Sequence, residues 1–437
     1  MARLFLELSQ LILFCFNLLT CSFVAAGLAS AETLPANSKL VASVFNEVYQ
    51  IKIATDSTAP KAAYGSCFVI DKAGLLATNF HVVAFALHDP EKYHLFLLDG
   101  DHIIPAEVVA FDAVNDIAIV RVDKIFPKAV RLASWLPDAG DKIYSIGWPE
   151  DLNKAVSEGN FNGLMTAGPY RKIQMSIPLN PGMSGGPTIN ELGEVIGVNV
   201  SLRTDSQSLA FAVPQDLLRS LMKKKPVIFS RPEDHATFDE EMRGQIEQVQ
   251  EQLTATFLKG GSSNINIGGW QVLKPNQMVK CWHSQESGAR DETLIISEQC
   301  YLSGATSIRR YLDTGTFRLK YQAVENRSLN QLQFVHYINE SLDDLAFNLT
   351  ESVDKFTTKI KCHQLDLLNT YKVPMRVHYC VNSYIPYAES YNLEFELATI
   401  NEGQKAFMIA GSFLGFSSHN VLAILRTLIN SIRPESR

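Results

Sequence analysis

The chain has 437 residues, of which 46% are hydrophobic and 19% are charged. At about 150 residues per domain, this length predicts two or three domains. The 39 basic and 46 acidic residues leave a net charge of −7. That charge argues against a general nucleic-acid-binding protein, which needs a basic face to replace phosphate counterions.

The first 31 residues are typical of an export signal. Arg3 supplies a positive charge ahead of an apolar stretch over residues 11–26, and Ala29-Ser30-Ala31 is a small-x-small cleavage pattern. We therefore predict cleavage after Ala31, a secreted or periplasmic protein, and no membrane span in the mature chain. The alternatives are a retained membrane anchor, for which the apolar stretch is short, and lipid attachment at Cys21, where the preceding residues resemble a lipobox.

Beyond the signal, the pattern of apolar and turn residues changes twice along the chain. Residues 38–226 contain short Val- and Ile-rich runs between turn residues, which is typical of an all-β barrel or sandwich. Residues 237–260 carry apolar side chains at spacings of three and four, which predicts an amphipathic helix. We expect this helix to begin with a capping box at Thr237 and to pack on a neighbouring domain, the alternative being a short coiled coil.

Residues 264–437 are predicted to form an α+β domain. Residues 317–321 and 393–397 alternate between apolar and polar side chains, as half-buried strands do. Residues 421–432 follow a helical pattern, for which Ser417 or Ser418 is the expected cap.

The most informative segment is Asn180-Pro181-Gly182-Met183-Ser184-Gly185-Gly186-Pro187. A nucleophilic Ser needs an exposed hydroxyl and backbone N–H groups directed at the developing oxyanion. Glycines on both sides of a Ser permit the tight loop that this geometry requires. The alternative interpretation is a Gly-rich hairpin turn.

A Ser hydroxyl is a weak nucleophile without a His to accept its proton and a carboxylate to orient that His. His81 directly follows a strand-like run, whereas His88, His94 and His102 lie in polar surroundings and are interpreted as surface residues. Asp116 borders an apolar run and is our candidate carboxylate. Asp112 is its rival.

These residues resemble a known family. The chain order His, Asp, Ser resembles the chymotrypsin-like (trypsin-fold) serine proteases, and within them the high-temperature-requirement (HtrA, Deg) proteases. Six motifs carry the resemblance over about 185 residues, and they are Gly65-Ser66-Cys67-Phe68-Val69-Ile70, Thr78-Asn79-Phe80-His81-Val82-Val83, Asn115-Asp116-Ile117-Ala118-Ile119-Val120, Ser145-Ile146-Gly147-Trp148-Pro149, Asn180-Pro181-Gly182-Met183-Ser184-Gly185-Gly186-Pro187 and Leu209-Ala210-Phe211-Ala212-Val213-Pro214.

The resemblance implies an all-β double barrel with the active site between the barrels. His81 would act as general base and then general acid, Asp116 would orient it, and Ser184 would form the acyl-enzyme. The N–H groups of Gly182 and Ser184 would form the oxyanion hole. The expected function is therefore a serine endopeptidase acting on protein or peptide substrates without cofactor or metal. The alternative is a binding or chaperone-like protein on a protease fold that cleaves weakly or not at all.

Several positions depart from the family pattern. Met183 replaces a polar residue before the nucleophile, so activation through an ion pair there is excluded. By the resemblance, an Asp at position 178 would favour cleavage after Arg or Lys, and Pro178 stands there instead. The residues expected to contact substrate are Pro178, Val198, Asn199 and Val200. No peptide-binding PDZ domain is evident after residue 226, and the oligomeric state stays open.

Five Cys remain once the signal is removed, and an exported chain favours disulfides. We predict Cys281–Cys300 and Cys362–Cys380, since each pair would join neighbouring segments of the C-terminal domain. Cys67 would then be a free, mostly buried thiol. The alternative is a zinc site that recruits nearby histidines, because mixed Cys and His ligands suit tetrahedral zinc; these are His283, His363 and His378.

Overall fold

The structure is a computed structural model, and the residues that it describes are 36–150, 152–200, 209–259, 262–275, 279–287, 292–302, 304–309, 312–343, 356–400 and 403–435. The expected signal over residues 1–31, with its cleavage site and Cys21, lies outside them. Helix α2 (Ala36–Phe45) is the first described element, and Val44–Arg437 forms one compact unit. In the described ranges, no helix is both long and apolar enough to cross a membrane.

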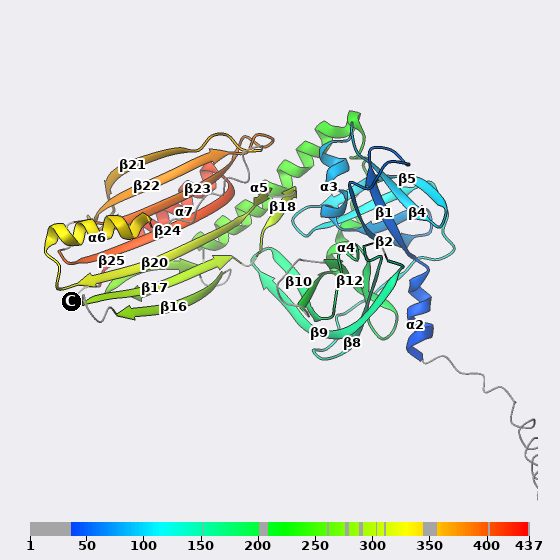
Figure 1. The fold of residues 1–437 in the computed structure, drawn as a ribbon, viewed down its shortest axis with the longest axis horizontal. Helices are drawn as coiled ribbons and strands as arrows, with labels where there is room; N and C mark the ends of the chain where they lie inside the picture. Colours follow the sequence, from blue (N-terminus) through cyan, green and yellow to red (C-terminus); the bar gives the residue numbers. More distant parts are fainter. Residues whose placement is uncertain are drawn as a thin grey trace, which may run out of the picture. The chain divides into compact units, whose positions relative to one another are not determined.

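The first six strands of this unit form a closed barrel, drawn in blue and cyan in Figure 1. Its strands follow one another around the barrel in the order β1-β2-β3-β6-β5-β4, and β4 pairs with β1 to close it. Side chains of Ile51, Val69, Leu76 and Val120 fill its interior. The elements are β1 (Val48–Ala54), β2 (Ala63–Asp71), β3 (Leu75–Thr78), α3 (Phe80–His88), β4 (His94–Asp99), β5 (His102–Asp112) and β6 (Ile117–Val122).

A second barrel follows. Its strands are ordered β11-β8-β9-β10-β13-β12, pairing of β11 with β12 closes it, and β7 adds to β12 in parallel. The core is again aliphatic, with Ile143, Ile173, Met175 and Ile196 fully buried. The elements are β7 (Arg131–Leu132), β8 (Lys142–Gly147), β9 (Ala155–Ala167), β10 (Tyr170–Ser176), β11 (Pro187–Ile189), β12 (Glu194–Val200), β13 (Leu209–Pro214) and α4 (Gln215–Leu221).

After the short 3-10 turn η1 (Pro232–Asp234), helix α5 (His235–Lys259) connects the first barrel to the C-terminal strands. Its apolar stripe is divided between two cores. Phe238, Met242 and Ile246 pack in the core of the first barrel. The second half of the stripe, Val249, Leu253 and Phe257, packs in the core of the C-terminal sheet.

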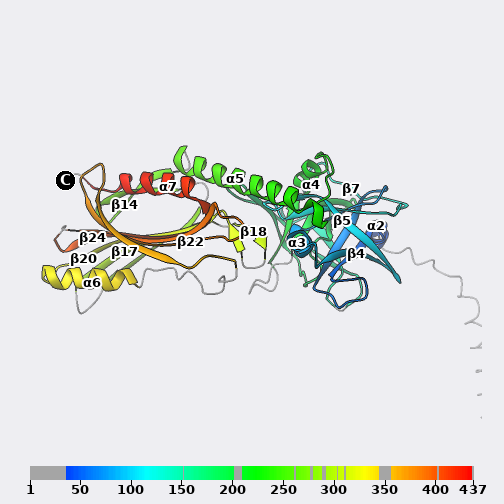
Figure 2. The same cartoon turned by 90° about the horizontal axis from the view of Figure 1, so that it is seen from above.

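The C-terminal region is built on a seven-stranded antiparallel sheet in the order β16-β17-β20-β24-β23-β22-β21. Helices α7 and α6 lie on opposite faces of this sheet (Figure 2). The elements are β14 (Ser262–Ile267), β15 (Trp270–Pro275), β16 (Val279–Ser287), β17 (Thr293–Leu302), β18 (Thr306–Arg309), β19 (Leu312–Thr314), β20 (Thr316–Asn326), α6 (Gln331–Asp343), β21 (Lys361–Leu368), β22 (Pro374–Ser383), β23 (Ser390–Thr399), β24 (Lys405–Ser417), α7 (Ser418–Ser431) and β25 (Arg433–Pro434).

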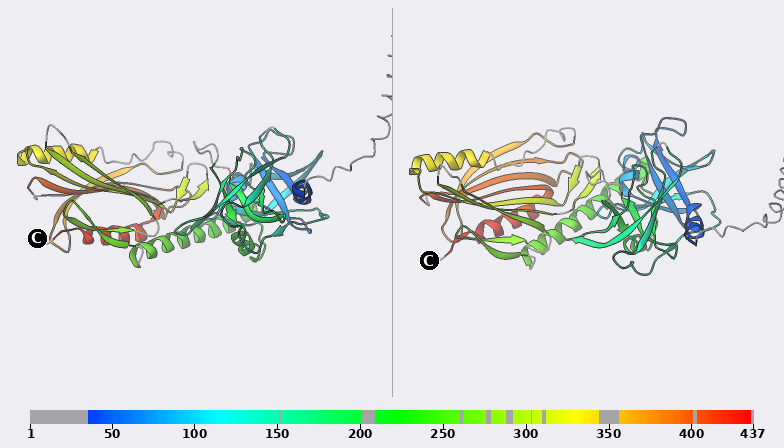
Figure 3. Two further views of the ribbon diagram at one scale, coloured as in Figure 1. Left: turned by 90° about the horizontal axis from the view of Figure 1, so that it is seen from below. Right: turned by 60° about the horizontal axis from the view of Figure 1, so that its bottom comes forward.

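The two faces of the sheet differ in what covers them. Val421 and Leu428 of α7 lie in the larger core, together with α5 and the small sheet β14-β15-β25. Phe334 and Ile338 of α6 cover a smaller cluster on the other face. Figure 3 shows both layers from two further directions.

Tyr170 connects the second barrel to the C-terminal region. The phenol is buried in the core of the large sheet, and its hydroxyl donates a hydrogen bond to the Gly315 carbonyl at 2.9 Å. A Cβ on Gly304 would lie only 2.6 Å from Cγ of this ring. The absence of a side chain at Gly304 therefore permits this packing.

Two local expectations differ from the structure. Helix α5 begins at His235 rather than at Thr237, because η1 leads directly into it, so Thr237 lies inside the first turn. His88 is not a surface residue, because its Nε2 lies 2.7 Å from the Ile308 carbonyl and its ring packs edge-on against Phe238. The other end of the chain follows the expectation: Ser417 caps α7, and its Oγ accepts the Asn420 N–H.

Candidate active site

His81 lies in the first turn of α3, directly after strand β3. Its Nδ1 is 2.9 Å from Asp116 Oδ2, and its main-chain N–H donates to Asp116 Oδ1, also at 2.9 Å. The carboxylate thus holds both the ring and the backbone of the same residue. The His81 side chain is 41% exposed and that of Asp116 is 20% exposed, so the imidazole is partly open to solvent.

Asp116 has an unusual backbone conformation. It immediately precedes β6, with φ at 62°, in the left-handed region that non-glycine residues seldom occupy. The Asn79 side chain donates from Nδ2 to the Asp116 carbonyl at 2.8 Å, which supports this conformation. Asn79 is fully buried.

The electrostatics favour an ionised Asp116. Burial raises the pKa of this carboxyl, but the charge of His81 and the hydrogen bonds from its ring and N–H more than offset burial, and the pKa lies below its ordinary value. The charge of Lys172 on β10 lowers the pKa less than the charge and ring hydrogen bond of His81 do, but more than the hydrogen bond from the His81 N–H. Burial in turn depresses the pKa of Lys172, against the opposing charges of Asp116 and Asp112.

The rival carboxylate, Asp112, has a different task. Its Oδ1 accepts the Asn115 N–H at 2.9 Å, and its Oδ2 accepts from Asn115 Nδ2 at 2.7 Å. It therefore shapes the turn between β5 and β6. Asp116 is the carboxylate that contacts His81.

The loop that carries Ser184 packs on strand β2 of the first barrel. The Ser184 carbonyl accepts the Ser66 N–H at 2.7 Å. Gly65, the neighbour of Ser66, lies between Ser184 and α3, since a Cβ there would be 2.8 Å from the Val82 side chain and 3.1 Å from the Ser184 carbonyl. The loop and the residue that follows His81 thus meet on the same stretch of β2.

The Ser66 hydroxyl joins two loops of the second barrel. It donates to the Gly182 carbonyl and accepts the Trp148 N–H, both at 2.8 Å. Pro181 is held from the other side, because its carbonyl accepts the Glu150 N–H at 2.9 Å. In a trans peptide the N–H is opposite to the C=O, so the Gly182 N–H points away from Glu150.

Met183 is completely buried. A Cβ on Gly147 would be 2.8 Å from Cα of Met183, so the Met183 backbone lies directly against the second barrel. An apolar side chain in this pocket requires no charged partner. Apolar packing, and not an ion pair, therefore holds the loop at Met183.

The residues expected to contact substrate occupy different environments. Pro178 is exposed, whereas Val198, Asn199 and Val200 are buried. The Asn199 side chain lies within 3.2 Å of the Ile146 carbonyl and also contacts the Thr188 hydroxyl, and its backbone pairs with Gly185 and Gly186. Through these contacts, Asn199 supports the loop that carries Ser184.

Ser66 and Asn79 were not singled out from the sequence, although both lie inside motifs that were. A buried polar side chain between glycine or strand residues was the available signal. The hydrogen-bond partner of Asn79 lies 37 residues away in the chain, and that of Ser66 lies 116 residues away. Sequence spacing alone does not indicate such contacts.

The cysteines pair locally in the structure. Disulfides link Cys281 to Cys300 and Cys362 to Cys380, while Cys67 is unpaired and buried. Burial raises the pKa of the Cys67 thiol well above its ordinary value. Among the described residues, two groups of side chains lie close enough together to hold a metal, and each includes one disulfide; they are Cys362, His378, Cys380 and Cys281, Glu298, Cys300.

Comparison with known proteins agrees with this geometry. Residues 65–198 match the family described as the trypsin-like peptidase domain. This part of the chain is a trypsin-like peptidase domain. Both barrels contribute strands to the matched segment, and the candidate residues His81, Asp116 and Ser184 all fall inside it.

The relatives of this peptidase domain are named as proteases. The chain is 34% identical over 171 residues to the putative serine protease HhoA of Synechocystis, covering 37% of this chain and 42% of that protein. It is 32% identical over 161 residues to a probable periplasmic serine endoprotease, DegP-like, of Pseudomonas fluorescens (35% and 33%). It is 28% identical over 173 residues to the serine endoprotease DegS of Escherichia coli (37% and 47%).

The resemblance to HtrA and Deg proteases is therefore confirmed for the peptidase domain. The chain spans less than half the length of each of these three relatives. The family match ends at residue 198, ahead of α5 and the seven-stranded sheet.

Proposed function

We propose that this chain is an exported serine endopeptidase that cleaves protein or peptide substrates through Ser184, His81 and Asp116. The observation that carries the proposal is the two-point contact of Asp116 with His81, through the ring and through the main chain. An ordinary ion pair at the surface joins two side chains and does not involve the main chain. A carboxylate that also binds the backbone N–H fixes the rotation of the imidazole.

The chemistry follows from that orientation. With Nδ1 donating to Asp116, Nε2 of His81 is the nitrogen that accepts the Ser184 hydroxyl proton. Ser184 Oγ attacks the scissile carbonyl, and the Gly182 and Ser184 N–H groups stabilise the oxyanion. Protonated His81 then gives its proton to the leaving amine, and water hydrolyses the acyl-enzyme by the same path. No metal or cofactor takes part in these steps.

The remaining assignments belong to the same proposal. Residues 1–31 act as a cleaved signal peptide and 38–226 as the protease domain; helix α5 (His235–Lys259) joins that domain to an α+β region over residues 264–437, which packs on the second half of the helix. The periplasmic name of one relative supports a secreted or periplasmic location. Two disulfides in the C-terminal region favour an oxidising compartment as well.

Covalent labelling with a fluorophosphonate probe tests the proposal. The probe should label wild-type chain at Ser184 and should fail to label Ser184→Ala. His81→Ala should lose labelling as well, since the base is gone. Ser66→Thr is a useful comparison, because it keeps a hydroxyl in the loop contact without changing the nucleophile.

Peptide cleavage provides the second measurement. Ser184→Ala should lower turnover by about 10⁴-fold or more, as removal of a triad member does. Turnover within tenfold of wild type would refute the role of Ser184. A wild-type chain that is folded but neither labelled nor active would support the binding or chaperone-like alternative.

A further inference from the structure

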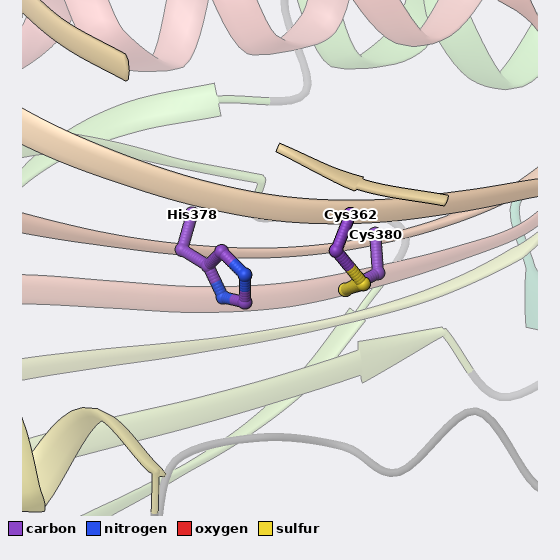
Figure 4. Close-up of side chains that lie close together, drawn as sticks. All are labelled: Cys362, His378 and Cys380. Atoms are coloured by element: carbon purple, nitrogen blue, oxygen red, sulfur yellow. A yellow bond between two sulfur atoms is a disulfide. The ribbon is translucent and has the colours of Figure 1, made fainter. Parts of the chain in front are cut away.

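Cys362, His378 and Cys380 form a compact cluster on one face of the large sheet. Cys362 of β21 lies opposite Cys380 of β22 in the strand register, and His378 precedes Cys380 by two residues on the same strand. Residues two apart on a strand share a face. One ligand atom from each residue lies within 4.8 Å of the other two. Figure 4 shows the disulfide and the imidazole beside it.

The second cysteine pair is enclosed. Cys300 is 0% exposed and belongs to the larger core, on the face that packs against α7. The carboxylate beside that pair, Glu298, is ion-paired with Lys274. By contrast, Cys362 is exposed and the His378 side chain is 48% exposed. The two disulfides therefore differ in access.

Strand β21 can accommodate a wider separation between the sulfur atoms of Cys362 and Cys380. It is an edge strand, paired with β22 on one side only, and its side chains are exposed almost throughout. Two sulfur ligands on one tetrahedral zinc lie about 3.8 Å apart, given Zn–S bonds of about 2.3 Å. A small outward shift of an edge strand provides that separation without disturbing the core.

We propose that Cys362, Cys380 and His378 form a redox-gated site for a thiophilic cation, represented by Zn²⁺. The oxidised pair is a disulfide and binds no metal. The reduced pair supplies two thiolates and His378 one ring nitrogen, a donor set that suits tetrahedral zinc with one position left open. Glu396 Oε2 lies 4.0 Å from His378 Nδ1, where a carboxylate can orient the ring.

The gating step is a thiol–disulfide exchange with a dithiol. One thiolate of the dithiol attacks Sγ of Cys362 or Cys380, which breaks the Cys362–Cys380 bond and forms a mixed disulfide. The second thiol of the dithiol then displaces the cysteine. Two electrons pass to the pair, the dithiol becomes a disulfide, and both cysteines leave as thiols. Zn²⁺ binding releases their two protons.

The test uses the full chain and a phosphine reductant, which reduces disulfides but competes weakly for zinc. Stepwise reduction, followed by alkylation and peptide mapping, should show Cys362 and Cys380 opening before Cys281 and Cys300. A chromophoric chelator in competition should then report one Zn²⁺ per chain after the first step and none in the oxidised chain.

Histidine variants separate the site from unspecific thiol binding. His378→Ala should keep the disulfide and lower zinc affinity by roughly tenfold or more, because removing a ligand should cost at least as much as removing a residue that only orients one. His283→Ala is the matched control, because His283 has the same two-residue spacing from Cys281, and its zinc binding should equal wild type. The proposal is overturned if the opened chain binds no zinc, if His378→Ala binds like wild type, or if Cys281–Cys300 opens first.

Discussion

A Cβ atom on Gly182 would collide with the carbonyl oxygen of Trp148. Gly182 also has φ at +93°, a conformation that an L side chain strains to adopt. Both conditions arise where the loop turns ahead of Ser184, so glycine is required there for two separate reasons.

The first prediction is that Gly182→Ala lowers turnover by about 10²-fold or more, the cost of losing one oxyanion donor. Steady-state peptide cleavage measures it. Gly100→Ala is the control: Gly100 also has positive φ but has open space around it, so it should be strained without loss of activity. If both variants lost activity equally, backbone strain and not the collision at Trp148 would explain the loss of turnover in Gly182→Ala.

A second prediction distinguishes the two carboxylates. Asp116→Asn should lower turnover by about 10⁴-fold, because the amide stabilises the wrong tautomer of His81. Asp112→Asn should cost far less, since the Asp112 carboxylate hydrogen-bonds to Asn115 and not to His81 in the described part of the chain. If Asp112→Asn were the more damaging change, our choice of orienting carboxylate would be wrong.

The lowered pKa of Asp116 gives a third prediction. A depressed carboxyl pKa contributes stability that is fully present above its ordinary value of about 3.9 and is lost as the pH falls through the folded value. The unfolding free energy of wild type, measured relative to that of Asp116→Asn, should therefore fall as the pH drops from about 5 to about 3. Urea unfolding between pH 3 and pH 7 measures it, and a difference that grew on acidification would contradict the assigned direction.

The fourth prediction concerns the thiol of Cys67. Burial and a raised pKa should keep this thiol unreactive to iodoacetamide at pH 8 in the folded chain. Denaturant without reductant should expose one reactive thiol among the mature cysteines, at Cys67. Rapid labelling of the native chain would contradict a closed first barrel.

A fifth prediction compares two glycines outside the active site. Gly304→Ala should destabilise the chain, because its Cβ would be 2.6 Å from Cγ of Tyr170. Gly244, inside α5, has nothing within 4 Å of such a Cβ, so Gly244→Ala should stabilise by roughly 0.5–1 kcal/mol. Thermal unfolding measures both, and a neutral Gly304→Ala would mean that the Tyr170 contact is loose.

The sequence was most informative where the expected chemistry also requires a particular backbone conformation. The motifs around His81 and Ser184 predicted strands and a glycine-rich loop, whereas helix α3, which begins at Phe80, was not predicted. The long-range partners were harder, because the contact of Ser66 with Gly182 depends on how two barrels meet. The start of α5 was misplaced by two residues because η1 precedes it, and helix ends are set by such local competition.

Helix α5 ties the first barrel and the C-terminal sheet together, so the two cannot easily be separated. Its first half completes the interior of a barrel, and its second half completes the interior of the large sheet, within one uninterrupted run of backbone. A cut anywhere along it removes apolar side chains from one interior or the other. The C-terminal region is consequently a poor candidate for exchange as an independent module, and a protease fragment ending before His235 would have to replace three buried side chains, Phe238, Met242 and Ile246, from elsewhere.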